Sequence, residues 1–240
     1  MAQNPIDERT FHEYLSLISD GITGLENWET SLRTQLGDCT ETAVVVFNSN
    51  PLTVGGRYLA QIASGRSRRL IVLVIQGKTD SGSHGNHEDT VLELPFADRL
   101  AMTQKALSDL GNVVVMPSGP YLIGRDDFPK GYLSETLGAA SAHAYLDCMA
   151  FCHICRALGI RSAYAGDEPR DEMSEIHLNT LRQLCAQSGI TLRVAERKRT
   201  DGDKYISSSM VRKALASGDM ETVEKLVPAE VLPYLAGHSA

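Results

Sequence analysis

Short runs of apolar residues, many of them β-branched, recur along the chain at intervals that suit a parallel β-sheet. They cover residues 43–47, 70–75, 112–116, 162–165 and 191–195. The runs are largely continuous rather than alternating with polar residues, which is typical of strands that are buried on both faces. The pattern therefore predicts about five buried strands.

Between these runs lie longer segments whose apolar residues are spaced three and four apart, as on one face of an α-helix. They cover residues 56–63, 96–110, 141–158 and 173–187, and residues 207–235 add two or three further helices. Strands that alternate with helices of this length favour right-handed βαβ crossovers. The predicted fold class is α/β, a Rossmann-like doubly wound parallel sheet of about five strands with a helical C-terminus.

The N-terminal segment has no strand-like run. Its apolar residues Phe11, Tyr14, Ile18, Leu25 and Trp28 are spaced as on an amphipathic helix. We therefore expect residues 1–41 to form a helical N-terminal extension, and residues 42–240 to form the α/β domain.

Length and charge narrow the classes of protein further. The chain has 240 residues, enough for one α/β domain of ordinary size, and 42% of them are hydrophobic. No apolar run approaches the roughly 20 residues of a membrane span, and the polar N-terminus lacks the apolar core of a signal peptide. A net charge of −7 disfavours non-specific nucleic-acid binding, and five cysteines are an odd number for a disulfide framework. We expect a cytoplasmic protein with no membrane or nucleic-acid partner, in which any affinity for anions is local.

The loop after the first predicted strand is a candidate phosphate site, because ligands of open parallel sheets bind beyond the carboxyl ends of the strands. It leads into a helix that begins with Gly55 and Gly56. Backbone can approach a phosphate closely there, and a helix N-terminus supplies N–H groups and a partial positive charge. A tight turn without a ligand is the alternative. The candidate residues are Asn48, Asn50, Pro51, Thr53, Gly55, Gly56 and Arg57.

Two later loops carry further candidates. Gly166, Asp167 and Glu168 follow the fourth strand, and one of these carboxylates is suited to holding a ribose, a base or magnesium. After the fifth strand, three hydroxyls precede or begin a helix, with an arginine on its first turn, an arrangement that suits the oxygens of a polyphosphate. Plain helix capping is the alternative. The residues of this second segment are Ile206, Ser207, Ser208, Ser209 and Arg212.

In this order and spacing, the segments resemble the nucleotidyltransferase domain of citrate lyase ligase (citrate lyase synthetase). That domain belongs to a superfamily with an HxGH-like signature after the first strand and an ISSTxxR-like signature near the end. The resemblance runs over residues 44–235. It also includes the segments 95–100, 118–129, 166–169 and 226–235.

The resemblance implies an ATP-dependent nucleotidyltransferase or acyl-activating ligase. Acetate is activated by ATP with release of pyrophosphate, and the acetyl group passes to a phosphopantetheine-type thiol on the acyl carrier subunit of citrate lyase. ATP and Mg²⁺ are the implied cofactors, and no dedicated metal-ligating residues are predicted. The implied catalytic residues are Thr53, Arg57, Ser208 and Arg212. The implied nucleotide contacts are Asn48, Asn50, Pro51, Gly55, Gly56, Gly166, Asp167, Glu168, Ile206, Ser207 and Ser209.

Two positions depart from the family pattern. Gly56 stands where family members have a histidine that stabilises charge on the α-phosphate, and Gln76 stands where they have a lysine. Compensation by neighbouring cations such as Arg57, Lys78 and Arg212 is one hypothesis. Two alternatives stay open beside it: a nucleotide-binding regulator that has lost catalysis, and a nucleotidyltransferase of the same superfamily with another acceptor.

Cysteine and histidine motifs offer competing hypotheses. Cys148, Cys152 and Cys155 have the C-x₃-C-x₂-C spacing of radical S-adenosylmethionine enzymes, but this spacing also puts all three thiols on one helix face. We expect buried core cysteines rather than a zinc or iron–sulfur site. His84 and His87 are predicted to be solvated residues of a loop rather than ligands of a metal ion. His143 and His177 fall in helical patterns and are expected to be surface or packing residues.

Overall fold

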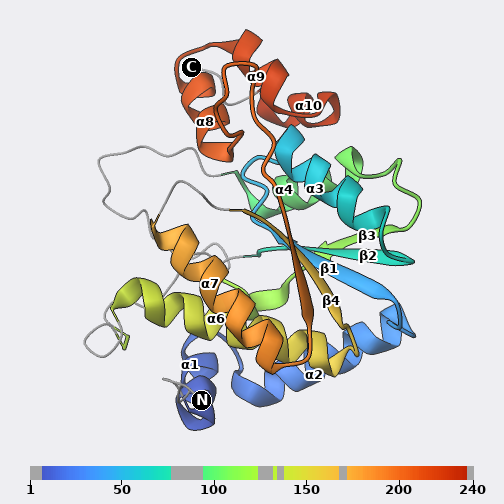
Figure 1. Cartoon of the computed structure of the whole chain (residues 1–240), viewed down its shortest axis with the longest axis vertical. Helices are drawn as coiled ribbons and strands as arrows, with labels where there is room; N and C mark the ends of the chain where they lie inside the picture. The colour runs from blue at the N-terminus through green and yellow to red at the C-terminus, as the bar shows by residue number, and fades with distance from the viewer. Residues whose placement is uncertain (1–6, 77–93, 124–131, 134–137, 168–171, 237–240) are drawn as a thin grey trace.

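Five parallel strands form one sheet at the centre of the computed structural model, which describes residues 7–76, 94–123, 132–133, 138–167 and 172–236. The strand order is β3-β2-β1-β4-β5, with β1 in the middle (Figure 1). In the register of the sheet, Val44 on β1 lies opposite Ile71 on β2 and Ala163 on β4. The predicted α/β fold class is confirmed. The strands are β1 Thr42–Phe47, β2 Arg69–Val74, β3 Val113–Pro117, β4 Ser162–Gly166 and β5 Thr191–Ala195.

Helices cover both faces of the sheet. On one face lie α1 Glu8–Ile18, α2 Gly21–Leu36, α6 Ala139–Ala157 and α7 Glu172–Gln187 (Figure 1). On the other lie α3 Val54–Ser64, α4 Phe96–Ala106, α8 Ser208–Ala216, α9 Met220–Leu226 and α10 Leu232–Leu235. Two 3₁₀ turns, η1 Gly119–Tyr121 and η3 Ala229–Val231, complete the described elements.

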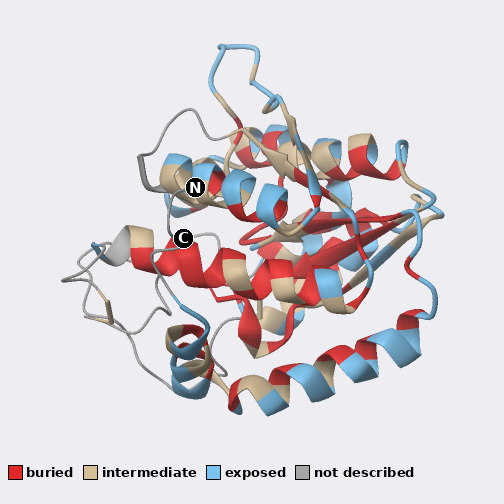
Figure 2. Cartoon of the chain, turned by 60° about the horizontal axis from the view of Figure 1, so that its bottom comes forward, coloured by how far each residue is buried: buried red, intermediate tan, exposed pale blue. Residues whose placement is uncertain are grey.

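The alternation of side chains along the strands divides the core in two. Val44 and Ile71 point to the face that carries α1, α2, α6 and α7. Val45 and Val72 point to the opposite face, towards α3, α4 and α8. Both sets are almost fully buried, which explains why the strands read as continuous apolar runs. Figure 2 shows the buried residues gathered on the sheet and on the faces of the helices that cover it.

The two N-terminal helices belong to the first of these cores. Tyr14 and Leu15 on α1 and Leu25 on α2 are fully buried in the same cluster as Phe151 and Cys155 on α6. The division of the chain near residue 41 stays a prediction, but the apolar face of residues 8–36 packs directly on α6.

Several helix boundaries differ from the predicted ones for local reasons. The helix expected from Gly56 begins at Val54, because the hydroxyl of Thr53 accepts a hydrogen bond from the Gly56 N–H at 3.1 Å and caps the helix. The helix expected to reach residue 110 ends at Ala106. Neither difference changes which loops reach the carboxyl ends of the strands.

A charged pair joins α2 to α6 and makes stability depend on pH. His153 Nδ1 lies 2.8 Å from Oε1 of the buried Glu29, and this hydrogen bond raises the pKa of His153 above its usual 6.5. The folded protein therefore holds the proton more tightly than the unfolded chain. The resulting stabilisation is complete below about pH 6.5 and is lost as the pH rises through the folded-state pKa. We expect the free energy of unfolding to fall across that window, and the fall to vanish in His153→Gln. Denaturant titrations from about pH 6 to about pH 9 measure this, and an unchanged fall in the variant would assign it to other groups.

Candidate functional site

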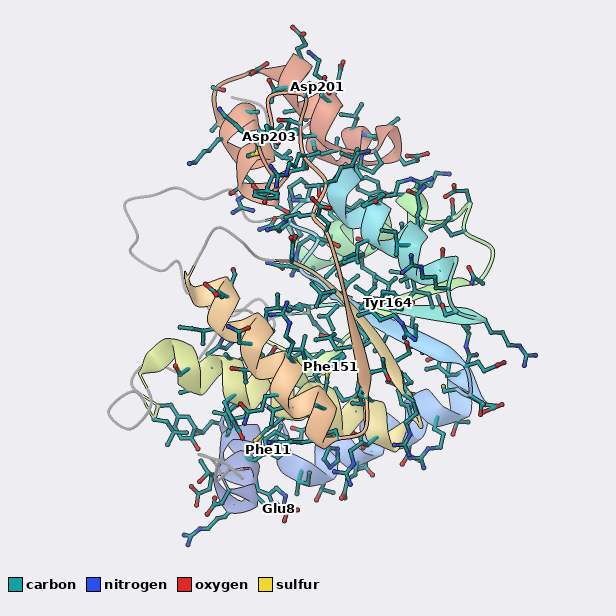
Figure 3. All side chains as sticks on the ribbon, in the orientation of Figure 1. Glu8, Phe11, Phe151, Tyr164, Asp201 and Asp203 are labelled. Carbon is teal, nitrogen blue, oxygen red and sulfur yellow. The ribbon has the colours of Figure 1, made fainter. Side chains whose placement is uncertain are left out.

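A cavity of about 470 Å³ opens at the carboxyl ends of β1, β4 and β5. It extends over both faces of the sheet, since its lining includes Phe151 from α6 and Tyr164 from β4, which belong to different cores. Both residues are labelled in Figure 3. This is where ligands of open parallel sheets bind.

The loop after β1 forms one wall of the cavity and is held by hydrogen bonds on the side away from the cavity. Ser49 has a φ of 55°, in the left-handed region, and the Asn50–Pro51 peptide bond is cis. The side chain of Asn50 is buried and accepts a hydrogen bond from the Leu94 N–H at 3.0 Å. The loop then runs into Thr53, the N-cap of α3. The first turn of α3 therefore begins at the cavity wall, where a helix N-terminus is able to offer N–H groups to an anion.

Arg99 on α4 is the principal support of this loop, and no role was predicted for it. The residue is 5% exposed. Nη1 donates to the carbonyl of Asn48 at 2.7 Å, to Oδ1 of Asn48 at 2.9 Å and to the carbonyl of Ile75 at 2.9 Å, while Nε donates to the carbonyl of Leu94 at 3.2 Å. The arginine thereby ties the carboxyl ends of β1 and β2 together beneath the cavity. Its place in the segment 95–100 of the predicted resemblance was the available signal.

The segment before and within α8 contacts the loop after β1 directly. Arg212 Nη1 donates to the carbonyl of Asn50 at 2.6 Å, and Ser208 Oγ donates to the carbonyl of Pro51 at 2.9 Å. Ser207 caps α8, accepting a hydrogen bond from the Met210 N–H at 3.4 Å. Two segments that are far apart in the sequence thus build one wall, with two helix N-termini on it.

The structure brings most of the predicted site residues to the cavity. Those on its surface are Asn48, Pro51, Thr53, Gly55, Gly56, Gly166, Ile206, Ser207 and Ser208. Asn50 and Arg212 lie behind them and hold the loop. Ser209 does not line the cavity, and its hydroxyl lies 3.0 Å from that of Ser207. Glu168 lies outside the described residues.

Arg57 and Asp167 are used elsewhere. The guanidinium of Arg57 forms an ion pair with Asp109 at 2.6 Å and also donates to the carbonyl of Ala106, so it fastens α3 to the end of α4 and does not line the cavity. Asp167 Oδ1 accepts a hydrogen bond from the Arg197 N–H at 2.7 Å and links the ends of β4 and β5. Their positions near the carboxyl ends of β1 and β4 in the sequence did not reveal where either side chain points.

The opposite wall carries a cluster that was not predicted as a site. His143, Asp147 and Cys148 on α6 and His177 on α7 all line the cavity. His177 Nε2 lies 3.1 Å from Asp147 Oδ2, and the Ile123 N–H donates to Asp147 Oδ1 at 3.2 Å. His143 Nε2 lies 3.1 Å from the carbonyl of Ile123. The buried His143 and the partly exposed His177 fit the expectation of packing or surface residues, but the helical pattern did not predict that both would line the cavity. The spacing of four between His143 and Asp147 on an otherwise apolar helix was the available signal.

The cysteines of α6 lie within the core. Cys148, Cys152 and Cys155 are buried, and burial raises the pKa of the Cys148 and Cys155 thiols. Among the described residues, no three histidine, cysteine, aspartate or glutamate side chains gather as a metal site. His84 and His87 lie outside the described residues. None of the described helices is long and apolar enough to cross a membrane.

The strand order, the cavity at the strand ends and the paired helix N-termini define a nucleotidyltransferase-type α/β fold. Pantoate-β-alanine ligase from Francisella tularensis, solved with β-γ ATP and β-alanine, shares it, with a TM-score of 0.52 at 17% identity over 82% of this chain and 73% of that one. The corresponding enzyme from Thermus thermophilus has a TM-score of 0.51 at 15% identity over 88% of this chain and 79% of that one.

Within that class, the chain belongs to the citrate lyase ligase family, because the sequence model of the citrate lyase ligase C-terminal domain matches residues 42–235. Two relatives are named citrate (pro-3S)-lyase ligase. The Escherichia coli K12 protein is 27% identical over 91% of this chain, and the Haemophilus influenzae protein is 26% identical over 91% of it. The chain spans 60% and 66% of the length of these relatives.

Proposed function

We propose that this chain uses ATP to activate a small carboxylate, releasing pyrophosphate, and then passes the acyl group to a carrier thiol. The observation that carries the proposal is the joint wall built by the loop after β1 and the start of α8, fastened by the contacts of Arg212 with Asn50 and of Ser208 with Pro51. Membership of the citrate lyase ligase family supports acetate and the acyl carrier subunit of citrate lyase as substrate and partner. We also propose that the protein is located in the cytoplasm.

The wall supplies what in-line attack on the α-phosphate requires, namely positioning and positive potential. The triphosphate would lie against the first turns of α3 and α8, in contact with Thr53, Gly55 and Ser207. Arg212 stands behind the loop and adds positive charge to it. We assign Arg57 a structural role, because its charge is used by Asp109. Gly166 and the end of β5 would line the nucleoside.

Magnesium fits this site as a companion of the triphosphate. Mg²⁺ usually keeps several waters and takes phosphate oxygens with one or two carboxylates. Glu196 lines the cavity and offers a carboxylate, and the hydroxyls of Thr53 and Ser208 are further oxygen donors. The ion, when bound, neutralises charge on the phosphates.

Calorimetry with ATP, CTP and AMP, followed by a pyrophosphate-release assay with acetate and other small carboxylates, tests the proposal. We expect ATP to bind, and we expect pyrophosphate to be released from ATP when acetate is added. Binding without release under any condition would favour the nucleotide-binding regulator, for which the absence of the signature histidine at Gly56 is the supporting observation. Failure of every nucleotide to bind would contradict both.

Replacing Arg212 with alanine should weaken binding of the triphosphate more than that of AMP. The variant loses a charged donor to the Asn50 carbonyl and a positive charge behind the phosphate loop. Charged hydrogen bonds contribute about 1.5–3 kcal/mol, so we expect the Kd for ATP to rise roughly 10- to 150-fold. Lys213→Ala, one residue further along the same helix, is the matched control. Equal losses for ATP and AMP would contradict a role at the phosphates.

A further inference from the structure

A second cavity, of about 670 Å³, lies at the amino ends of β1, β4 and β5, on the edge of the sheet opposite the first cavity. Thr42 at the start of β1 lines the second cavity, and Phe47 at the end of β1 lines the first. At about 3.3 Å per residue, the two sites are roughly 17 Å apart along this strand. We call the second cavity the arginine groove, because its lining includes Arg66, Arg68, Arg161 and Arg193.

The lining of the arginine groove is entirely polar over the part of the chain that the structure describes. Besides the four arginines and Glu41, it consists of serines, threonines and glycines. Four cations and one carboxylate make the groove locally positive, although the whole chain has a net charge of −7. Such a surface attracts an anion and offers no contact to an apolar ligand.

Hydrogen bonds hold the walls of the groove in place. Asn112 Nδ2 donates to the carbonyls of Ser64 and Ser67 at 2.9 and 3.0 Å, and thereby fixes the turn that follows α3. On the opposite wall, Arg193 Nη1 on β5 donates to Ser162 Oγ on β4 at 2.6 Å. Because the walls are fixed before anything binds, an occupant loses less conformational entropy in ordering them.

The other arginines have most of their charge available. Arg68 Nη1 lies 3.9 Å from a carboxylate oxygen of Glu41, but both side chains are largely exposed, and ion pairs of this kind are weak. Within the described residues, the guanidinium groups of Arg66 and Arg161 have neither a hydrogen bond nor an ion pair. Both side chains are exposed, so their positive charges are free to meet an anion from outside.

Neutralisation of helix ends does not account for these two arginines. The helices α3, α6 and α7 end at this edge of the sheet, where cations stabilise the last carbonyl groups. At the end of α6 this role belongs to Arg33, whose Nε donates to the carbonyl of Ala157 at 3.1 Å. Arg66 and Arg161 make no hydrogen bond to a terminal carbonyl in the described part of the chain.

We propose that the arginine groove docks an acidic segment of a partner protein. Guanidinium groups suit carboxylates, because two parallel N–H groups reach both oxygens. The arginines come from three separate places, namely the turn after α3, the residue before β4, and β5, so they suit a partner with several spaced charges. Single-stranded nucleic acids usually also stack their bases on aromatic side chains, and no aromatic side chain of the described residues lines the groove.

The position of the groove leaves the first cavity open while a partner is bound. The two cavities lie at opposite ends of the same strands, so an acidic segment in the groove would not compete with a nucleotide. The groove would therefore hold this chain in a complex and leave its first cavity accessible. This inference is independent of the proposed function, because it uses none of the residues of the first cavity.

Fluorescence anisotropy with a labelled oligoglutamate peptide tests the proposal. We expect the peptide to bind the wild-type chain at low ionic strength, and its Kd to rise as salt is added. Arg66→Gln combined with Arg161→Gln should raise the Kd roughly 2- to 30-fold, the range for the loss of two exposed ion pairs. The Tm of this double variant should stay at the wild-type value, because neither guanidinium has a partner within the described residues.

Arg9→Gln combined with Arg182→Gln is the matched control, because it removes two exposed positive charges that do not line the groove. It should leave peptide binding unchanged. Absence of binding, an unchanged Kd in the groove variant, or an equal rise in the control would overturn the proposal. Tighter binding of tripolyphosphate or of an oligouridylate through Arg66 and Arg161 would also overturn it, in favour of a small anion or a nucleic acid.

Discussion

Gly56→His should accelerate pyrophosphate release by about 10²- to 10³-fold, the effect of one added donor to the developing charge. Gly56 lines the cavity on the first turn of α3, at the position where the family resemblance places a histidine. A preorganised donor of this kind is worth about 2.7–4 kcal/mol in the transition state. A Cβ at this position would meet Leu52 Cδ1 at 2.9 Å, so the end of that side chain must shift. Such an adjustment costs about 1–3 kcal/mol, and this cost falls on the folding stability of the protein rather than on the transition state.

Gly56→Ala separates the two effects of this substitution. It places the same Cβ against Leu52 but supplies no donor, so it should leave the rate unchanged or lower it. The measurement is the initial rate of pyrophosphate release at saturating ATP and acetate. Equal rates in the alanine and histidine variants would show that charge stabilisation comes from elsewhere on the wall.

Arg99→Met should destabilise the protein by about 3–5 kcal/mol and abolish nucleotide binding at ordinary concentrations, since each buried acceptor that loses its partner costs about 1–3 kcal/mol. The variant fills a similar volume but leaves the carbonyls of Asn48, Ile75 and Leu94 without their donor. For a chain of this size the corresponding fall in Tm is roughly 6–20 °C.

Thermal unfolding followed by circular dichroism measures this, with Arg9→Met as the control. Arg9 makes an exposed ion pair with Glu13 on α1, and ion pairs of this kind contribute little to the free energy of unfolding. The Tm of the control should barely change. If Arg99→Met unfolded at the wild-type temperature, the arginine would not be the support of the loop after β1.

The fold was predictable because its signals are local. Continuous apolar runs identify strands buried on both faces, and β1 and β2, which have such runs, are interior strands of the sheet. The convergence of Thr53, Gly55, Ser207 and Ser208 on one cavity was also predictable, since they lie in short segments next to strand ends. Their convergence follows from the rule that parallel strands end at the same edge.

The remaining site residues depend on side-chain direction and on contacts that are remote in sequence. Arg57 is one helical turn from the loop, yet it faces Asp109, 52 residues away. His177 contacts Asp147 on the neighbouring helix, and Asp147 accepts a hydrogen bond from the backbone of Ile123. Sequence spacing alone does not reveal pairs of this kind. Arg99 was hidden for the same reason, because its partners come from three separate segments of the chain.

The most direct test of the account is the exchange of labelled pyrophosphate into ATP, catalysed by the wild-type chain in the presence of acetate and Mg²⁺. Exchange requires that ATP bind, that the carboxylate attack the α-phosphate and that the step be reversible. We predict exchange that depends on the carboxylate and is reduced in Arg212→Ala. ATP binding without exchange, with acetate or any other small carboxylate, would contradict the account and leave a nucleotide-binding protein without ligase activity.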